Sequence, residues 1–578
     1  MASRLILFIL LGAIAACSHP DERVSHTLTI GMAQMPATLD PRYATDAYSV
    51  RVQELIHRGL VRLDEHFQVV PDLAVSWEYP SKQSIRFRLR RGIRFHNGRE
   101  LTAKDVAATL KAVCDPAMGS PLRSQLQSVT KIVVEDAYTI RLDLSRPDAA
   151  LLAHLNLGVL PASLASAPQQ AHFTIGCGAY RIAEWKNGRG LKLVPAVRRD
   201  LFTLRFLRVK DPVTRVLKLV RGELDLVQND LPIYLIPFLK RHEAIHVRMI
   251  PSTTFSYLGL NLHDPHLKDV RVRQALALAI DREKLKQGLM AGIPRLAETV
   301  LPPGHWAAAS LPLTMYDPEK AERLLDAAGF PRGSDGIRFR LTYRTSTDPL
   351  RMRLAVAIAS MWEHIGIETR VESMEWGGFY ARIKQGDFQV YSLSWVGIVD
   401  PDVYRWILHS SMWPPKGANR GRFADPKVDA WLDQGARALD MDERRGWYLL
   451  VQQRMHEAFV YIPLWYEAVV VAAGDRASSF RPRPDGSLRG LLELTQSSVS
   501  GRKKLSRLVI TPSNTCRTSP SSHMASSDPW TSTRPPGISM VKGRTCPSRC
   551  QTAAAVAQAP DPQASVLPAP RSMMSIHT

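Results

Sequence analysis

FRLRRGIRFHNGRELTAKDV, residues 87–106, passes from a strand through a tight turn into a helix. Its first residues continue an alternation of apolar residues with arginines, which predicts a strand with one apolar face. Gly92 and Gly98 enclose the string IRFHN and favour turns in which φ is positive. Thr102 has the residue type of a helix N-cap and precedes an apolar-periodic run over residues 104–113, which predicts a helix. The stretch therefore predicts mixed α and β structure.

The rest of the chain alternates strands and helices in the same way. No internal repeat is present, and the pattern predicts an α/β fold. The expected strands are the start of 27–41, then 74–79, 84–91, a hairpin over 131–144, 245–250, 255–260, 337–343 and 368–371, and the expected helices are 48–63, 104–113, 271–289, 318–328 and 350–365.

Length and charge set the first limits on the class of protein. A chain of 578 residues exceeds one ordinary core, so two or three lobes are expected. The formal net charge is +21; ten Lys/Arg and two Asp/Glu from residue 497 onward give +8, which leaves +13 for the rest. The basic residues are scattered among acidic ones with no aromatic-interleaved patch, which favours a solvated surface over nucleic-acid binding.

The first residues predict export and a lipid anchor. Arg4 precedes an apolar run, Leu5–Ala16, that is too short to span a bilayer. The run ends in Ile14-Ala15-Ala16-Cys17, which resembles the bacterial lipobox, so Cys17 is the expected lipidation site. A secretory signal that happens to contain a cysteine is the alternative. Either way the protein is exported to a periplasmic or extracytoplasmic location, and which membrane holds the anchor stays open.

Two further features leave alternatives open. Cys114 and Cys177 either form a disulfide after export or remain two buried thiols. From residue 497 the composition changes abruptly to Ser, Thr, Pro and Arg, without any period. Residues 497–578 are therefore either a disordered tail or the product of a shifted reading frame.

Several ordered blocks carry a family resemblance over about 470 residues. The G-x-x-F-H-x-G core of residues 87–106 is the most specific of them. The chain resembles extracellular solute-binding protein family 5, the dipeptide, oligopeptide and nickel receptors of ABC importers. The blocks are Leu39–Glu78, Phe87–Val106, Gly176–Trp185 (GCGAYRIAEW), Tyr257–Leu285 and Tyr316–Phe330 (YDPEKAERLLDAAGF).

This resemblance implies a two-lobed, hinged, periplasmic-binding-protein-like fold with an extra domain (class II, cluster C). It implies a monomeric binding protein, not an enzyme, that needs no cofactor and captures a peptide or peptide-like solute by lobe closure. Its expected partners are that solute and the permease and ATPase subunits of an ABC importer. By analogy, domain I comprises 26–58, 176–262 and 471–496, domain II is 59–175, and domain III is 263–470.

The resemblance also implies where the solute binds. Peptide-binding members use the loop after the LDP string and a W-x-x-D-Y-x-D-P-like string, whose aspartate pairs with the peptide's amino group. The corresponding string is SWVGIVDPD, in which Ile398 stands at the aspartate position. We expect either an unconventional ligand or an anchor relocated to Asp400 or Asp402. Core packing is the alternative for each aromatic residue. The expected ligand-binding residues are Thr45, Asp46, Ala47, Trp376, Trp395, Ile398, Asp400 and Tyr466.

Other functions compete with this one. Residues 242–246 spell H-E-x-x-H, a zinc-hydrolase signature when it lies on a helix. The residues that follow alternate as a strand, which takes His242 and His246 out of helical register and argues against a metal site. A periplasmic chaperone or a signalling receptor on the same fold is a further alternative.

Overall fold

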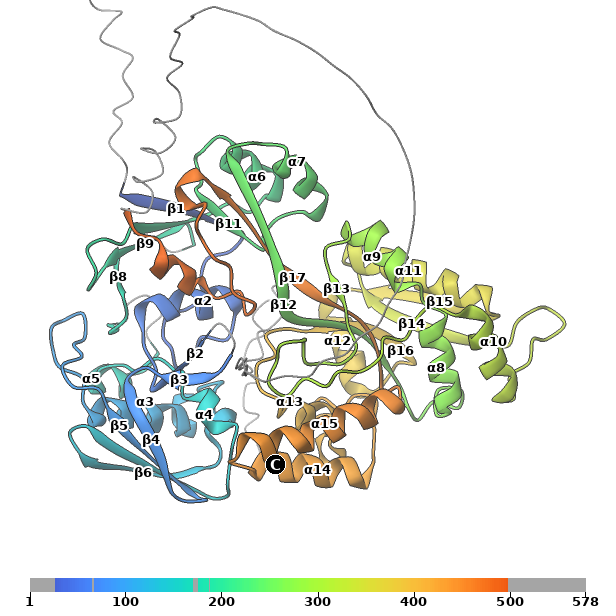
Figure 1. The fold of residues 1–578 in the computed structure, drawn as a ribbon, viewed down its shortest axis with the longest axis horizontal. Helices are drawn as coiled ribbons and strands as arrows, with labels where there is room; N and C mark the ends of the chain where they lie inside the picture. Colours follow the sequence, from blue (N-terminus) through green and yellow to red (C-terminus); the bar gives the residue numbers. More distant parts are fainter. Residues whose placement is uncertain (1–25, 65–66, 170–174, 187, 497–578) are drawn as a thin grey trace, which may run out of the picture.

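Two lobes are connected by a pair of long antiparallel strands, β12 (Ile245–Leu260) and β17 (Tyr461–Gly474), in the computed structural model of the protein (Figure 1). The pairing runs from Ile245 opposite Gly474 to Gly259 opposite Tyr461, so both strands belong to both lobes. The two-lobed α/β fold expected from the sequence is confirmed. The structure describes residues 26–64, 67–169, 175–186 and 188–496.

One continuous sheet passes through the two lobes, with β12 and β17 at its centre. In the direction of the chain, β12 runs from the first lobe into the second, and β17 runs back from the second lobe into the first. The strand order is β15-β14-β16-β12-β17-β11-β1-β10-β9-β8, and β13 pairs with β17. The remaining bounds are β1 Thr27–Met32, β8 Tyr180–Lys186, β9 Gly190–Pro195, β10 Thr203–Arg208, β11 Leu226–Gln228, β13 Arg295–Leu296, β14 Phe339–Ser346, β15 Ile367–Met374 and β16 Val390–Trp395.

The pairing of β12 with β17 is irregular where the strands pass between the lobes. The register shifts between Pro251 and Phe255, and again between Ser256 and Tyr257. Extra residues in one strand of a pair bend it and increase its local twist. The sheet therefore changes direction at this point, and residues 245–250 and 255–260 are one bent strand rather than the two predicted.

The opening stretch begins in β5 of a separate small sheet, of order β4-β5-β7-β6. It ends in α3 (Ala103–Cys114), which lies between β5 and β6 in the chain and begins with a capping box in which Thr102 and Asp105 bond reciprocally. Gly92 and Gly98 have φ of 74° and 86°, as the turn prediction requires. The strands are β4 Ala74–Ser81, β5 Ser84–Leu89, β6 Val129–Asp136 and β7 Thr139–Leu144, and a hairpin of β2 Val61–Leu63 and β3 Val69–Pro71 lies beside them.

Helices cover the sheets of both lobes (Figure 1). Separate buried apolar clusters lie in the small-sheet domain, in the rest of the first lobe and in the second lobe. The helices are α2 Ala47–Ile56, α4 Leu151–His154, α5 Ala162–Ala165, α6 Pro212–Val220, α7 Ile236–Lys240, α8 Val270–Leu278, α9 Arg282–Met290, α10 Pro318–Ala327, α11 Pro349–His364, α12 Trp376–Gln385, α13 Val403–Leu408, α14 Pro426–Arg437 and α15 Met441–Glu457.

Two helix predictions were too long. The helix expected over 48–63 ends at Ile56, because the chain leaves helical geometry at His57 and forms β2. The helix expected over 271–289 is two helices, since Asp281 caps a second one with its side chain. The predicted signal segment and the tail from 497 lie outside the described residues. Among the residues that the structure describes, no helix is long and apolar enough to cross a membrane.

The GCG string joins the small-sheet domain to the rest of the first lobe. The backbone N–H of His96 donates to the carbonyl of Gly176 at 2.9 Å, and its ring Nε2 lies 3.1 Å from the carbonyl of Gly178. Between these glycines Cys177 is buried, and burial raises the pKa of its thiol to about 12. Cys177 and Cys114 are free thiols in this structure, but only Cys177 is buried, and Cys114 is half-buried.

Replacing Gly176 with alanine should destabilise the protein, because an added Cβ would lie 1.9 Å from the carbonyl oxygen of Ile56. We expect a loss of about 1–3 kcal/mol and a lower melting temperature in calorimetry. Gly446, within α15, is the matched control, because its added Cβ would have no atom within 4 Å. Gly446→Ala should stabilise by about 0.5–1 kcal/mol. Equal melting temperatures for Gly176→Ala and wild type would contradict the close approach.

Candidate functional site

The carboxyl ends of three parallel strands form one edge of the second lobe. β14 runs parallel to both β15 and β16, so Ser346, Met374 and Trp395 end their strands at the same edge. Trp395 pairs with Phe255, close to the point at which β12 enters from the first lobe. This edge therefore faces the junction of the lobes. Ligands of α/β proteins commonly bind at such carboxyl edges.

A cavity of about 970 Å³ lies between the lobes, large enough for a small organic solute. Aromatic side chains line both of its sides. The first lobe contributes Phe67, Gln68, Val69, Trp77, Tyr79, Ala149, Leu152 and Ala153, and the second lobe contributes Arg295, Glu298, Pro303, Gly304, His305, Trp306, Ala308, Ala309, Ser310, Leu311, Asp400, Leu439, Met441, Asp442, Arg444 and Arg445.

A buried ion pair forms part of the cavity wall. Arg444, from α15, donates to both carboxylate oxygens of Asp400, with Nη1 at 2.8 Å from Oδ2. The backbone N–H of Asp402 also donates to Asp400 Oδ1 at 2.8 Å. The side chains of Arg444 and Asp400 are 4% and 6% exposed. Both oxygens of Asp400 are thus occupied, so Asp400 lines the cavity but offers no free carboxylate to a ligand's ammonium group, and its contact with a ligand stays a prediction.

Burial also sets the protonation of the groups around this pair. Desolvation lowers the pKa of His305 to about 3, which keeps its imidazole neutral at physiological pH. Desolvation and the nearby Asp400 charge raise the pKa of Asp402 to about 6. The hydroxyl of Tyr448 donates to Asp402 Oδ1 at 3.0 Å. The pKa of Asp402, the other predicted anchor, therefore lies above that of an exposed aspartate.

The two predicted tryptophans differ in exposure. Trp376 is half-buried at the start of α12 and stacks on Tyr380, with ring centroids 5.4 Å apart. Trp395 is buried; its ring stacks on Tyr257 and lies 4.9 Å from the guanidinium carbon of Arg420. Trp376 retains surface at the carboxyl edge, whereas Trp395 supports that edge from beneath.

Ile398 and Tyr466 are core residues, which corrects their expected place on the pocket surface. Ile398 is 1% exposed and belongs to the apolar cluster behind the edge. Tyr466 is 0% exposed, and its hydroxyl donates to the carbonyls of Thr299 and Leu301 at 2.7 and 3.0 Å. Neither side chain offers a ligand a surface in this structure.

The predicted loop of Thr45, Asp46 and Ala47 begins α2 in the first lobe, and all three residues are half-buried. Asp46 accepts hydrogen bonds from the backbone N–H groups of Tyr48 and Ser49 at 3.0 and 2.9 Å. It therefore acts as a helix N-cap. A contact between this loop and a ligand remains a prediction.

Several cavity residues were missed from the sequence. Arg444 and Trp306 lie in stretches without a recognisable motif, and Phe67, Trp77 and Tyr79 come from domain II, in which no ligand-binding residue was predicted. Arg444 follows its partner Asp400 by 44 residues, and only the fold brings the two together. A pattern of spacing could not have identified the pair.

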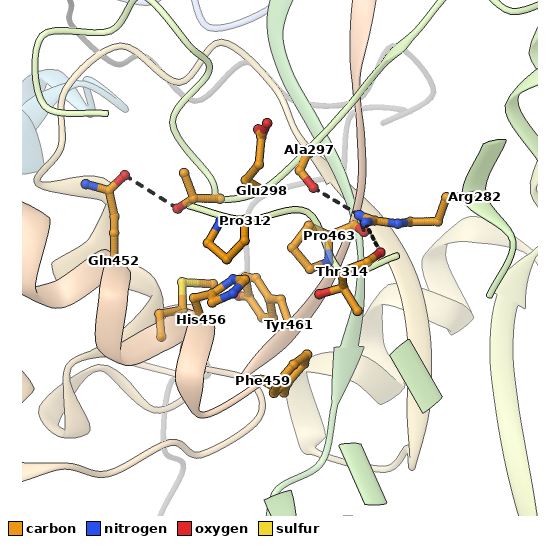
Figure 2. A pocket seen from close by; sticks show the side chains of 12 residues that line it. Arg282, Ala297, Glu298, Pro312, Thr314, Gln452, His456, Phe459, Tyr461 and Pro463 are labelled. Atoms are coloured by element: carbon orange, nitrogen blue, oxygen red, sulfur yellow. Dashed lines mark hydrogen bonds between the residues drawn. The ribbon is translucent and has the colours of Figure 1, made fainter. Parts of the chain in front are cut away.

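Figure 2 shows a second cavity, of about 20 Å³, inside the second lobe. Arg282 reaches it from α9 and donates to the backbone carbonyls of Ala297, Thr314 and Pro463 at 3.0, 2.6 and 2.8 Å. The space holds no more than one or two waters. Arg282 therefore fastens loops of the second lobe and does not belong to a solute site.

The H-E-x-x-H string does not form the metal site of a helical hydrolase. His242 follows the end of α7, and His246 lies in β12. Nε2 of His246 is 2.9 Å from Oδ1 of Asp475. Within the described parts of the chain, no group of three or more His, Cys, Asp or Glu side chains is placed to hold a metal ion. The strand predicted for this segment is confirmed.

Comparisons with known proteins agree with this geometry. Residues 68–413 match the profile of "Bacterial extracellular solute-binding proteins, family 5 Middle". The "Probable di/tripeptide-binding protein 5" of Pseudomonas aeruginosa (strain UCBPP-PA14) is 26% identical over 459 residues, which cover 72% of this chain and 85% of that protein. The "Glutathione-binding protein GsiB" of Escherichia coli (strain K12) is 27% identical over 474 residues, which cover 78% of this chain and 90% of the relative.

Solved structures extend the similarity to the fold. NikZ from Campylobacter jejuni in complex with Ni(L-His) superposes with a TM-score of 0.66 at 26% identity, over 78% of this chain and 94% of that one. HbpA2 from Haemophilus parasuis gives a TM-score of 0.72 at 24% identity, over 80% and 98%. Two lobes with a solute-sized cavity between them define a solute-binding protein. The chain belongs to family 5 of the bacterial extracellular solute-binding proteins.

Removing Arg444 should strongly destabilise the protein, because Asp400 would be left as a buried charge without a partner. We expect Arg444→Met to cost about 3–5 kcal/mol. The double replacement Asp400→Leu with Arg444→Met should recover most of that loss, since it removes both charges. Urea unfolding of both variants measures the difference.

The adjacent Arg445 is the matched control for this experiment, because it lines the same cavity but is exposed. Arg445→Met should change the stability by less than about 0.5 kcal/mol. Equal stability of Arg444→Met and wild type would show that the ion pair does not hold the wall.

Proposed function

We propose that this protein is the receptor subunit of an ABC importer and captures a peptide or peptide-like solute between its lobes. The observation that carries the proposal is the cavity of about 970 Å³ whose walls come from both lobes. A solute in that space contacts both lobes only when they are close together. Binding therefore shifts the population toward a closed state, which the permease and ATPase subunits recognise.

The two crossing strands support a hinge. The register of β12 and β17 shifts at residues 251–257, between the part that pairs within the first lobe and the part that pairs within the second. Hinges commonly lie at a few residues that absorb changes in φ and ψ. We propose the hinge there, a few residues before the boundary between domain I (26–58, 176–262 and 471–496) and domain III (263–470). Domain II is 59–175.

The chemistry of the cavity supports a solute that is both polar and apolar. Aromatic rings of Phe67, Trp77 and Trp306 provide apolar walls, and charged side chains lie among them. Peptides combine an apolar surface with charged termini, and the names of the relatives from Pseudomonas and Escherichia refer to peptides and glutathione. A peptide or a related compound is therefore the solute that we propose.

The proposed place of action is outside the cytoplasm, at a membrane surface. The Ile14-Ala15-Ala16-Cys17 string supports lipidation of Cys17 after export. A diacylglycerol with a further acyl chain gives stable anchoring, whereas a single chain does not. In this arrangement a monomeric receptor stays close to the importer's membrane subunits.

Closure is tested with the solute that native mass spectrometry finds in gently purified protein. After that solute has been removed by denaturation and refolding, adding it back should reduce the radius of gyration in small-angle scattering. The melting temperature should rise with dose, because the solute binds the folded state. A solute that raises the melting temperature but leaves the scattering curve unchanged would argue against a hinged receptor.

Lipidation is tested by metabolic labelling with palmitate. Wild-type protein should take up the label and fractionate with membranes, and Cys17→Ala should do neither, because the thiol is the acceptor. Cys114→Ala controls for the loss of a cysteine elsewhere and should behave as wild type. Wild-type protein that never incorporates palmitate would refute the anchor.

A further inference from the structure

The outer edge of the first lobe is strongly basic. Residues 180–210 include β8, β9 and β10, and they contain nine Lys/Arg and two Asp/Glu, which gives a formal charge of +7. All nine basic residues are exposed, namely Arg181, Lys186, Arg189, Lys192, Arg198, Arg199, Arg205, Arg208 and Lys210. Basic residues that the sequence presents as scattered are thus concentrated on one part of the first lobe.

Few of these cations have an acidic partner. Lys186 pairs with Glu184 at 2.7 Å and Arg198 pairs with Asp200 at 2.6 Å, which uses both acidic residues of the stretch. In the part of the chain that the structure describes, no carboxylate lies within ion-pair distance of the other seven. Most of the positive charge of this surface is therefore not neutralised within the protein.

The strand register brings the cations to one face of the sheet. Arg205 lies opposite Lys192 in the pair of β9 and β10, and β8 is the edge strand of the sheet (Figure 1). Successive side chains of a strand point to opposite faces, so both residues point away from Leu193 and Phe206, which fill the core. The outward face of β8, β9 and β10, with Arg181, Lys192 and Arg205, is named the basic face.

Exposed apolar residues lie on the same side of the sheet as the basic face. Leu207 is two residues beyond Arg205 in β10, so it points to that side, and it packs against a cluster that includes Val216 of α6. Val213 and Leu217, also in α6, are 41% and 40% exposed. Exposed apolar residues together with Lys and Arg favour binding at the interface of an anionic membrane.

The described chain begins at this face. Thr27, the first residue of β1, lies opposite Thr203 of β10, and Thr29 lies opposite Arg205. Ten residues separate Thr27 from Cys17. Because an extended chain spans at most about 3.6 Å per residue, a lipid on Cys17 would hold Thr27 within about 36 Å of the bilayer. The proposed anchor therefore favours contact between the membrane and this edge of the first lobe.

We propose that the basic face binds anionic phospholipid headgroups, so that the protein lies with the edge of its first lobe on the membrane surface. Lys and Arg side chains gain free energy from the negative potential of such a surface. The contact adds to the proposed lipid anchor, but it does not depend on lipidation of Cys17. Since the basic face belongs entirely to the first lobe, the second lobe stays free to move.

A second basic stretch, residues 86–99, competes for this role. Part of its charge is neutralised, because Arg86 pairs with Glu135 and Arg99 pairs with Asp105. It also begins in the separate small sheet, which does not contain β1. Charge and chain connectivity thus both favour the basic face.

The test uses the unlipidated Cys17→Ala chain and two kinds of vesicle, phosphatidylcholine alone and an equal mixture with phosphatidylglycerol. In cosedimentation at low salt, this chain should prefer the mixed vesicles about tenfold or more. Adding Lys192→Gln with Arg205→Gln should reduce that preference about tenfold, and NaCl at about 0.5 M should remove it through screening. Both residues are exposed, so the melting temperature should not change.

The matched control is Lys320→Gln with Arg353→Gln, which removes two exposed cations from α10 and α11 of the second lobe. Its preference should stay within about twofold of the parent chain. The apolar run at 5–16 and the basic tail from 497 are the same in every variant, so a difference between variants belongs to the substituted residues. Arg88→Gln with Arg91→Gln tests the competing stretch.

Three outcomes would overturn the proposal. They are equal binding of the parent chain to both kinds of vesicle, an unchanged preference after Lys192→Gln with Arg205→Gln, and a preference lost only with Arg88→Gln and Arg91→Gln. Each outcome is distinct from failure of the receptor function or of the lipid anchor, because solute-induced closure and palmitate labelling are measured separately.

Discussion

The antiparallel pairing of β12 with β17 is the constraint on which the rest of the structure depends. These strands of 16 and 14 residues run from one lobe into the other, and the sheet of each lobe grows outward from them. Because backbone hydrogen bonds fix the register on both sides of residues 251–257, the irregular pairing is confined to the stretch between the lobes. A change in the angle between the lobes costs the least free energy where the hydrogen-bonded pairing of β12 with β17 is already interrupted. Within this stretch the hydroxyl of Ser256 donates to Glu467 of the neighbouring strand at 2.8 Å.

Buried arginines stabilise the second lobe around that junction. Arg273 donates to the carbonyls of Ala458 and Leu267, and Arg282 binds three further carbonyls. Arg444 is bound by a carboxylate instead. A buried guanidinium is tolerated only when its donors are satisfied, so each arginine fastens loops that would otherwise pack loosely. Charged side chains of this kind hold the fold together and are not free to bind a ligand. The groups left for a ligand are the partly exposed ones.

The sequence predicted the fold well because its strongest signals were local. The alternation before Gly92, the positive-φ turns and the Thr102 cap are each decided by a few neighbouring residues, and all are present. The helix expected through residue 63 failed because apolar spacing continued past Ile56 while the chain turned into a strand. The site was less predictable, since its surfaces are made by contacts distant in sequence. Tyr466 and Ile398 are buried, and the spacing of residues along the sequence does not predict how deeply a side chain is buried.

The position of a binding group decides what its interaction with a solute can achieve. A contact made equally in the open and closed states adds affinity but does not shift the population between those states. In the proposed receptor, a contact between the solute and second-lobe residues such as Arg295 or Trp306 would persist when the first lobe moves. In that receptor, the free energy of closure would come from the opposite wall of the cavity, to which the first lobe contributes Phe67, Trp77 and Tyr79. Capture and closure would thus depend on different surfaces of the same cavity.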